Sequence, residues 1–226
     1  MSCKLKAVLW DMDGVLANTA ELHFLTWKNA LEGIGYYQWT NEKFIATFGM
    51  NNQGILEALL GEPPSPELVA SITEQKEGEY RRLLPGNVSL LPGVLNWLSW
   101  LHEHHIPQAV ASSAPQANIE TFVDELQIRA YFDTLVSGFD MPGKPDPGVY
   151  LLAASRLQVA PKYCLVIEDA IAGVEGAWRA GMCCLAVTTT NPRSALWRAT
   201  QVVDSLELIP PEEWFPEYLE QEKTGG

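Results

Sequence analysis

The sequence predicts an α/β fold, a doubly wound parallel sheet core with an inserted all-helical cap domain. From residue 94 onward, short apolar runs alternate with helix-like patterns, as in parallel sheets covered by helices on both faces. The apolar run Ala7–Trp10 adds a strand near the start of the chain. Residues 18–85 show only helical periodicity and turn residues, so they are expected to form a separate helical insert.

The helical insert follows the first strand closely. Its first helix is expected to start at Asn18, a good N-cap residue, with Glu21 three residues later. Further helical patterns cover residues 41–48, 52–60 and 65–84, divided by glycine and proline. The predicted domains are therefore 18–85 for the cap, and 1–17 together with 86–226 for the core.

The rest of the chain supplies the core. The expected helices are 94–102, 118–126, 147–157 and 173–180, and the expected strands are 108–111, 134–137, 164–167, 184–187 and 202–203. Such a Rossmann-like sheet binds ligands at the carboxyl ends of its strands. Residues 210–226 are rich in proline and glutamate, so we expect a loosely held tail.

Composition excludes several kinds of partner. The net charge of −13 argues against nucleic acid and anionic membranes, which attract basic surfaces. No apolar run has the length of a membrane span, and the N-terminus does not resemble a signal peptide. The four cysteines include no Cys-x-x-Cys pair. They are expected to be thiols of a cytoplasmic protein, and we expect a monomer or weak homo-oligomer.

Two carboxylates, Asp11 and Asp13, follow the first strand. Carboxylates this close repel each other unless a cation or a proton lies between them. Gly14 then allows a sharp turn. A polar turn without chemistry is the alternative interpretation, since Asp and Gly are common turn residues. Three later strand ends also carry reactive residues, and they favour a metal and substrate site over a simple polar turn.

The next two strand ends offer groups that suit an anion. Ser112 and Ser113 follow the strand 108–111, where hydroxyls and free backbone N–H groups favour anion binding; a capping serine is the alternative. Lys144 lies just before the N-terminus of the helix expected at 147. The helix dipole is positive at this end and therefore disfavours a cation there. That position suggests an anionic partner, although a solvated surface lysine is the simpler alternative.

The fourth strand end carries two adjacent carboxylates, Glu168 and Asp169. Burying them without compensation is costly. A divalent cation with oxygen ligands would compensate them, and Mg²⁺ fits a site with few carboxylates, some water and a substrate phosphate.

Taken together, these motifs resemble the haloacid dehalogenase-like superfamily of phosphotransferases, in its β-phosphoglucomutase-like branch with a helical cap. The resemblance covers nearly the whole chain, and its three motifs are specific jointly. They are Asp-Met-Asp-Gly-Val-Leu at 11–16, Gly-Lys-Pro-Asp-Pro at 143–147 and Ile-Glu-Asp-Ala-x-x-Gly at 167–173.

The resemblance implies a role for each residue. Asp11 would be the nucleophile that forms an aspartyl-phosphate, and Asp13 the general acid and base. Ser112 and Lys144 would hold the phosphate, with Ser113 beside it. The cofactor would be Mg²⁺, and its ligands would be Asp11, the backbone carbonyl of Asp13, Asp169 and, directly or through water, Glu168.

The resemblance leaves two activities open. A phosphatase acting on small phosphorylated metabolites, including sugar phosphates, is favoured over a β-phosphoglucomutase-type isomerase. His23 and Lys76 match substrate-binding residues of the mutase branch, but Asn52 stands where that branch has an arginine, which would grip a second phosphate. A surface histidine is the alternative for His23. A dehalogenase and a catalytically inactive binding module are weaker readings.

Overall fold

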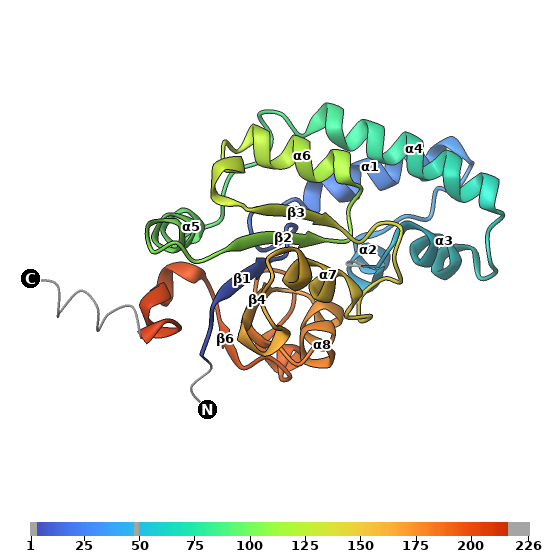
Figure 1. Ribbon diagram of the computed structural model, residues 1–226. Helices are drawn as coiled ribbons and strands as arrows, with labels where there is room; N and C mark the ends of the chain where they lie inside the picture. Colours follow the sequence, from blue (N-terminus) through green and yellow to red (C-terminus); the bar gives the residue numbers. More distant parts are fainter. Residues whose placement is uncertain (1–3, 48–49, 217–226) are drawn as a thin grey trace, which may run out of the picture.

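The computed structural model describes residues 4–47 and 50–216. Its centre is a parallel sheet of six strands in the order β3-β2-β1-β4-β5-β6 (Figure 1). The strands are β1 Ala7–Trp10, β2 Gln108–Ser112, β3 Thr134–Ser137, β4 Cys164–Glu168, β5 Cys183–Val187 and β6 Gln201–Val203. The predicted α/β sheet and all six of its strands are confirmed.

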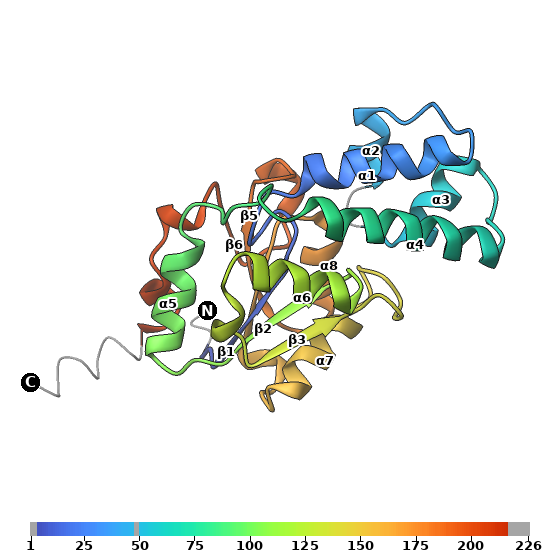
Figure 2. The ribbon, with the colours of Figure 1, turned by 90° about the horizontal axis from the view of Figure 1, so that it is seen from above.

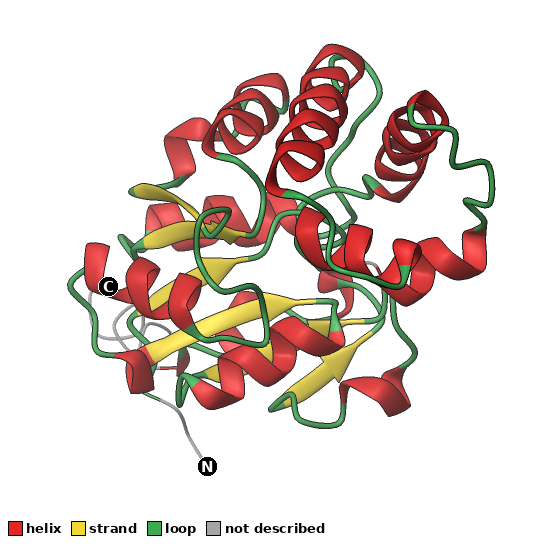
Figure 3. Cartoon of the chain, turned by 90° about the vertical axis from the view of Figure 1, so that its right-hand side faces the viewer, coloured by secondary structure: helices red, strands yellow, loops and turns green. Residues whose placement is uncertain are grey.

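Side chains alternate between two buried faces along each strand. Val8 and Trp10 of β1 pack into one apolar cluster, with helices α5 (Val94–Glu103) and α6 (Gln116–Glu125). Ala7 and Leu9 pack into the other, with α7 (Gly148–Arg156) and α8 (Ile171–Arg179). The sheet is therefore covered on both faces, as the alternating pattern predicts; Figure 3 shows the strands between the helices.

Between β1 and α5, the described residues form helices and no strand of the sheet. These helices are α1 Ala20–Gly33, α2 Asn41–Thr47, α3 Asn52–Leu60 and α4 Pro66–Leu83. They enclose an apolar cluster of their own around Trp27, Trp39 and Leu56. Figure 2 shows them gathered on one side of the molecule, away from α5.

The chain leaves the sheet and returns to it along adjacent segments. Ala17 forms an isolated β-bridge with Leu90, and the Leu91 N–H donates to the Leu16 carbonyl at 3.0 Å. The predicted insert therefore starts and ends at neighbouring points. The exact domain boundaries, 18–85 for the cap and the remainder for the core, stay a prediction.

Two local expectations are wrong in detail. The N-cap residue of α1 is Thr19, not Asn18, because the Asn18 side chain accepts from the N–H of Ala20, two residues later, in a turn that precedes the helix. The described part of the expected tail is packed and not loose. Trp214 and Phe215 are buried in the cluster that contains α5, since their apolar surface outweighs the polar composition around them.

The cysteine expectation also needs correction. Cys164 and Cys184 are buried thiols, as expected, but Cys183, at the partly exposed start of β5, is disulfide-bonded. A bond of this kind depends on how two cysteines lie in the fold, which the spacing of cysteines along the sequence does not show. Cys3 lies outside the described residues.

Among the described helices, none combines the length and apolar content needed to cross a membrane.

Candidate active site

The carboxylates of two neighbouring strands meet at one edge of the sheet. Asp11 directly follows β1, Glu168 ends β4, and Trp10 pairs with Ile167 across the two strands. One carboxylate oxygen from each of Asp11, Glu168 and Asp169 lies within 4.8 Å of the others. All three side chains are buried. Parallel pairing therefore brings together acids that are far apart in the sequence.

Lys144 lies between two of these carboxylates. Its Nζ donates to Asp11 Oδ1 at 2.5 Å and to Glu168 Oε1 at 2.7 Å. The ammonium also lies 5.1 Å from the centre of the Tyr150 ring, whose hydroxyl donates to the same Glu168 oxygen at 2.7 Å. The anionic partners that the position of Lys144 suggested include carboxylates of the protein itself.

Burial dominates the protonation of this group. Desolvation raises the pKa of Asp11 to about 7, although the attraction of Lys144 opposes the shift. The pKa of Asp169 lies well above its usual range, because the side chain is desolvated and faces Glu168 and Asp11. Both shifts disfavour the ionised forms of Asp11 and Asp169, and a further positive charge beside them would oppose the shifts.

The donor set fits a divalent cation. Asp169 Oδ1 is buried and has no hydrogen-bond partner among the described residues, while its Oδ2 accepts from the Thr190 hydroxyl. Glu168 is occupied, because its oxygens accept from Lys144, Tyr150 and the N–H groups of Asp169 and Ala170. Oxygen ligands of this kind suit Mg²⁺. Asp11 and Asp169 are the carboxylates with capacity left for a metal.

Two glycines make room for these carboxylates. A Cβ on Gly173 would lie 1.7 Å from Glu168 Oε1, and a Cβ on Gly14 would lie 2.0 Å from Asp169 Oδ2. Gly14 also has a φ of 81°, a conformation that other residues rarely adopt. Each side chain other than hydrogen would displace an acid of the site.

Asp13 points away from the other carboxylates. Its Oδ1 accepts from the Thr19 hydroxyl at 2.5 Å, lies 3.1 Å from His23 Nε2 and is 3.5 Å from the Tyr80 hydroxyl. Burial acts to raise the pKa of Asp13, but the His23 ring and the hydrogen bonds from His23 and Thr19 outweigh it, so this pKa is lowered. The predicted contribution of the Asp13 backbone carbonyl to a metal site stays a prediction.

A chain of polar contacts continues from Asp13 into the inserted helices. Lys76 Nζ lies 3.1 Å from His23 Nδ1 and donates to Glu77 Oε1 at 3.0 Å. Since an ammonium can only donate, Nδ1 of His23 accepts and Nε2 carries the hydrogen that faces Asp13. Asn52 Nδ2 donates to the same Glu77 oxygen at 2.8 Å. The structure thus brings together His23, Lys76 and Asn52.

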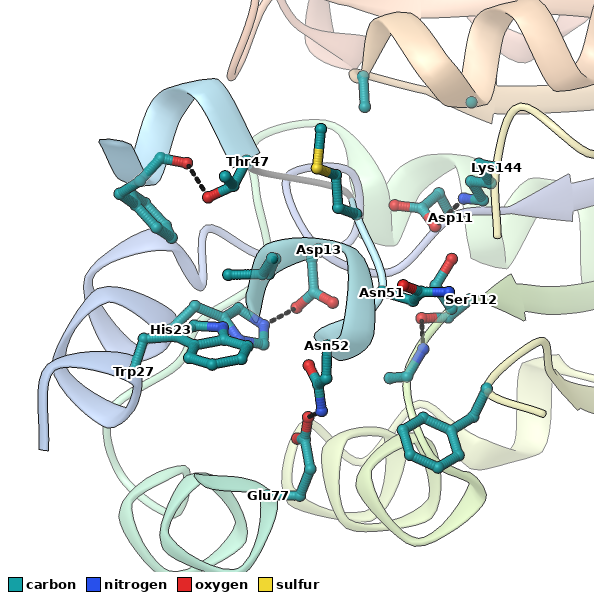
Figure 4. Close-up of a pocket in the computed structure, with 18 of the residues that line it drawn as sticks. Asp11, Asp13, His23, Trp27, Thr47, Asn51, Asn52, Glu77, Ser112 and Lys144 are labelled. Atoms are coloured by element: carbon teal, nitrogen blue, oxygen red, sulfur yellow. Dashed lines mark hydrogen bonds and ion pairs between the residues drawn. The ribbon is translucent and has the colours of Figure 1, made fainter. Parts of the chain in front are cut away.

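The acids of the site and the polar chain from His23 to Asn52 line one cavity of about 830 Å³, its opening to solvent included. Ser112 and Ser113 lie on the core wall, and the Ser112 hydroxyl accepts from the Ala114 N–H at 3.1 Å. Figure 4 shows Ser112 and Lys144 on one side, with His23 and Trp27 on the other. Apolar side chains complete the lining, among them Trp27, Phe44, Met50, Ile55 and Phe139.

Four polar residues near the site escaped sequence reasoning. Thr19 and Tyr80 contact Asp13, Thr190 contacts Asp169, and Glu77 contacts Lys76. Glu77 had a weak signal, since it directly follows a lysine that the resemblance marks. Tyr80 and Thr190 had none, because only tertiary packing brings them to the acids.

Comparisons with known proteins identify the family of the chain and similar folds. The family model described as haloacid dehalogenase-like hydrolase matches residues 8–187. A phosphorylated carbohydrates phosphatase of Thermotoga maritima is 33% identical over 92% of this chain and 96% of its own. A β-phosphoglucomutase of Bacillus subtilis is 34% identical over 83% and 85%. A solved hydrolase structure from Entamoeba histolytica, 27% identical, superposes with a TM-score of 0.84 over 94% of this chain and 98% of that one.

Proposed function

The chain belongs to the haloacid dehalogenase-like hydrolase family, and on that premise we propose that it is a Mg²⁺-dependent phosphatase of small phosphorylated metabolites. Sugar phosphates are the favoured substrates, because a relative that aligns along nearly its whole length acts on phosphorylated carbohydrates. The observation that carries the proposal is the buried contact of Lys144 with Asp11, beside a carboxylate cluster with capacity for a metal.

In the first step, a carboxylate oxygen of Asp11 attacks phosphorus and the bond to the ester oxygen breaks. Among the described residues, the hydrogen bond to Asp11 falls on Oδ1, so Oδ2 is the oxygen with free lone pairs. Asp13 protonates the leaving oxygen. The described hydrogen bonds of Asp13 fall on Oδ1, which leaves Oδ2 for the substrate.

In the second step, water attacks the aspartyl-phosphate and Asp13 accepts its proton, which releases phosphate and restores Asp11. The lowered pKa of Asp13 suits this role as a base. His23 Nε2 lies 3.1 Å from Asp13 Oδ1, and its hydrogen bond would hold the Asp13 carboxyl group in position while Asp13 donates a proton in the first step and recovers one in the second.

The remaining residues position the phosphoryl group. Ser112, Ser113 and Lys144 line the core wall of the cavity and would hold the phosphate oxygens. Mg²⁺, held by Asp11 and Asp169, would neutralise charge on the transferring group. Helices α1–α4 would act as the cap that contacts the rest of the substrate. A cytoplasmic location and a monomeric or weakly oligomeric state remain predictions.

The test is a panel of phosphorylated metabolites assayed for phosphate release with Mg²⁺ and with excess chelator. We expect release from sugar phosphates that stops with chelator and returns with Mg²⁺. The Asp11→Asn variant is the matched control for contaminating phosphatases. Full activity in chelator, or release by this variant, would contradict the proposal.

A β-phosphoglucomutase activity is the second candidate, favoured by the 34% identical relative and by the contact of His23 with Asp13. Against it, Asn52 is neutral and bonds Glu77, so it offers no charge to a second phosphate. Supplying β-glucose 1-phosphate with catalytic bisphosphate separates the two. Glucose 6-phosphate forming much faster than free phosphate would favour the mutase.

A further inference from the structure

The cap side of the cavity contains a buried carboxylate that the reaction does not use. Glu77 of α4 is 5% exposed and lines the cavity. Its Oε1 accepts from Lys76 Nζ and Asn52 Nδ2, and its Oε2 accepts from Asn118 Nδ2 of α6 at 2.5 Å. Figure 4 shows Glu77 beneath Asn52, across the cavity from Lys144. The carboxylate is held from three sides by donors.

These contacts keep Glu77 ionised. Burial acts to raise its pKa, but Lys76 and the Asn52 hydrogen bond outweigh it and lower the pKa. The charge of Lys76 is therefore compensated within the protein. Its ammonium is further confined, since it lies 5.8 Å from the centre of the Trp27 ring and 5.4 Å from that of Tyr80.

The cap end consequently offers little attraction to an anion. Apart from His23, the described residues that line the cavity include two cations, Lys76 and Lys144, and both are paired with carboxylates. Lys144 belongs to the phosphoryl site. A second phosphate at the cap end would meet the negative charge of Glu77 without an unpaired lysine or arginine among the described lining residues, and like charges at a desolvated contact are strongly unfavourable.

We propose that Glu77 makes the cap end of this cavity select the uncharged, hydroxylated end of a monophosphate and reject a second phosphate. The inference rests on the proposed phosphatase function and narrows its substrate class to polyol and sugar monophosphates. An ionised carboxylate has about four acceptor sites, and described donors fill three of those on Glu77. A substrate hydroxyl can take the fourth in a charge-assisted hydrogen bond.

The test compares D-mannitol 1-phosphate with D-mannitol 1,6-bisphosphate at fixed free Mg²⁺. Mannitol has two equivalent ends, so either phosphate of the bisphosphate presents the same reacting group. Phosphate release gives kcat/KM for each compound. For the wild-type protein we expect the monophosphate to be favoured by roughly tenfold or more, the scale of one unfavourable charge contact.

The matched variants are Glu77→Gln and Glu79→Gln. Glu77→Gln removes the charge but keeps the size and an acceptor oxygen, so the preference should shrink by about tenfold. Glu79 lies on the same helix and bonds Asn29 and Arg82, and Glu79→Gln should leave the preference unchanged. Thermal unfolding of both variants verifies that they are folded. If Glu77→Gln does not fold, the ratio of kcat/KM for the monophosphate to that for the bisphosphate in the wild type still tests the proposal.

The possible failures are separable. Equal or better use of the bisphosphate by the wild type, or an unchanged ratio in folded Glu77→Gln, would overturn the role of Glu77. Lack of activity on both mannitol compounds, with other sugar phosphates hydrolysed, would overturn it as well. Lack of phosphate release from every compound in the panel would refute the phosphatase proposal instead.

Discussion

Two buried lysines of one cavity illustrate two ways of positioning charge. The side chains of Lys144 and Lys76 are 5% and 4% exposed. Lys144 bonds two carboxylates, Asp11 and Glu168, that neighbouring strands present. Lys76 bonds a single carboxylate, Glu77 on its own helix, and a histidine of α1. The contacts of Lys144 depend on the pairing of strands in the sheet. The contacts of Lys76 depend on helix α4 and on its packing against α1.

This contrast has a consequence for function. Parallel pairing of β1 with β4 fixes the acids around Lys144 to within a residue, so this group is suited to the reaction itself. The contact of Lys76 with His23 holds only while α1 and α4 stay packed, and α1 and α4 contact each other closely along their lengths. We therefore expect changes near Lys144 to abolish chemistry and changes near Lys76 to alter its rate and selectivity.

The largest expected effect follows from Asp11→Asn. An amide cannot form the acyl-phosphate, so phosphate release should fall below detection on any substrate that the wild type hydrolyses. Steady-state assays with purified variant and wild type would show it. Near-normal turnover by the variant would rule out Asp11 as the nucleophile.

Asp13 connects the two groups and should have a smaller effect. Asp13→Asn removes the acid and base but leaves the nucleophile, so kcat should fall by roughly 10²–10⁴. Single-turnover measurements would show slower formation and slower hydrolysis of the phosphorylated enzyme. A change confined to KM would contradict a role in proton transfer.

The two lysines themselves can be compared directly by stability. Lys144→Met leaves two buried carboxylates without their cation, which should cost about 3–5 kcal/mol in the free energy of unfolding. Lys76→Met should cost less, because Glu77 keeps its hydrogen bonds from Asn52 and Asn118. Urea unfolding in excess chelator measures both. Equal losses in the free energy of unfolding would show that pairing Lys144 with two carboxylates stabilises the protein no more than pairing Lys76 with one.

The smallest effect concerns pH and Mg²⁺. Burial raises the pKa of Asp11 to about 7, against about 3.9 for an unfolded chain, so between these values the folded metal-free protein binds more protons than the unfolded one. Its stability should therefore fall as pH rises through this window. Mg²⁺ competes with those protons, and its stabilising effect should be larger at pH 8 than at pH 5.5.

Thermal unfolding with and without Mg²⁺ at both pH values measures this difference. We expect a shift of the melting temperature by several degrees at pH 8, since about 1 kcal/mol shifts a domain of this size by roughly 2–4 °C. Asp169→Asn should reduce the shift. An equal shift at both pH values would show that Asp11 is ionised across the whole range.

Local pattern was sufficient for the sheet and for the acids at its edge. Asp11, Ser112 and Glu168 end or directly follow buried apolar runs, and parallel strands present such residues at one edge. The order of the motifs also revealed the family. The start of α1 was less certain, because Thr19 stands at the N-cap position without a capping hydrogen bond from its side chain, which donates to Asp13 instead. No local pattern shows that partner.

The sequence alone was therefore enough for the sheet, the acids and lysine at its edge, and the helical insert, because each depends on the periodicity of neighbouring residues. Folding in three dimensions was needed to place Tyr80 against Asp13 and Glu77 against Asn118, and to bury Phe215. These contacts join elements far apart in the chain, and their partners are chosen by packing and by the need to pair buried polar groups, which no local pattern records.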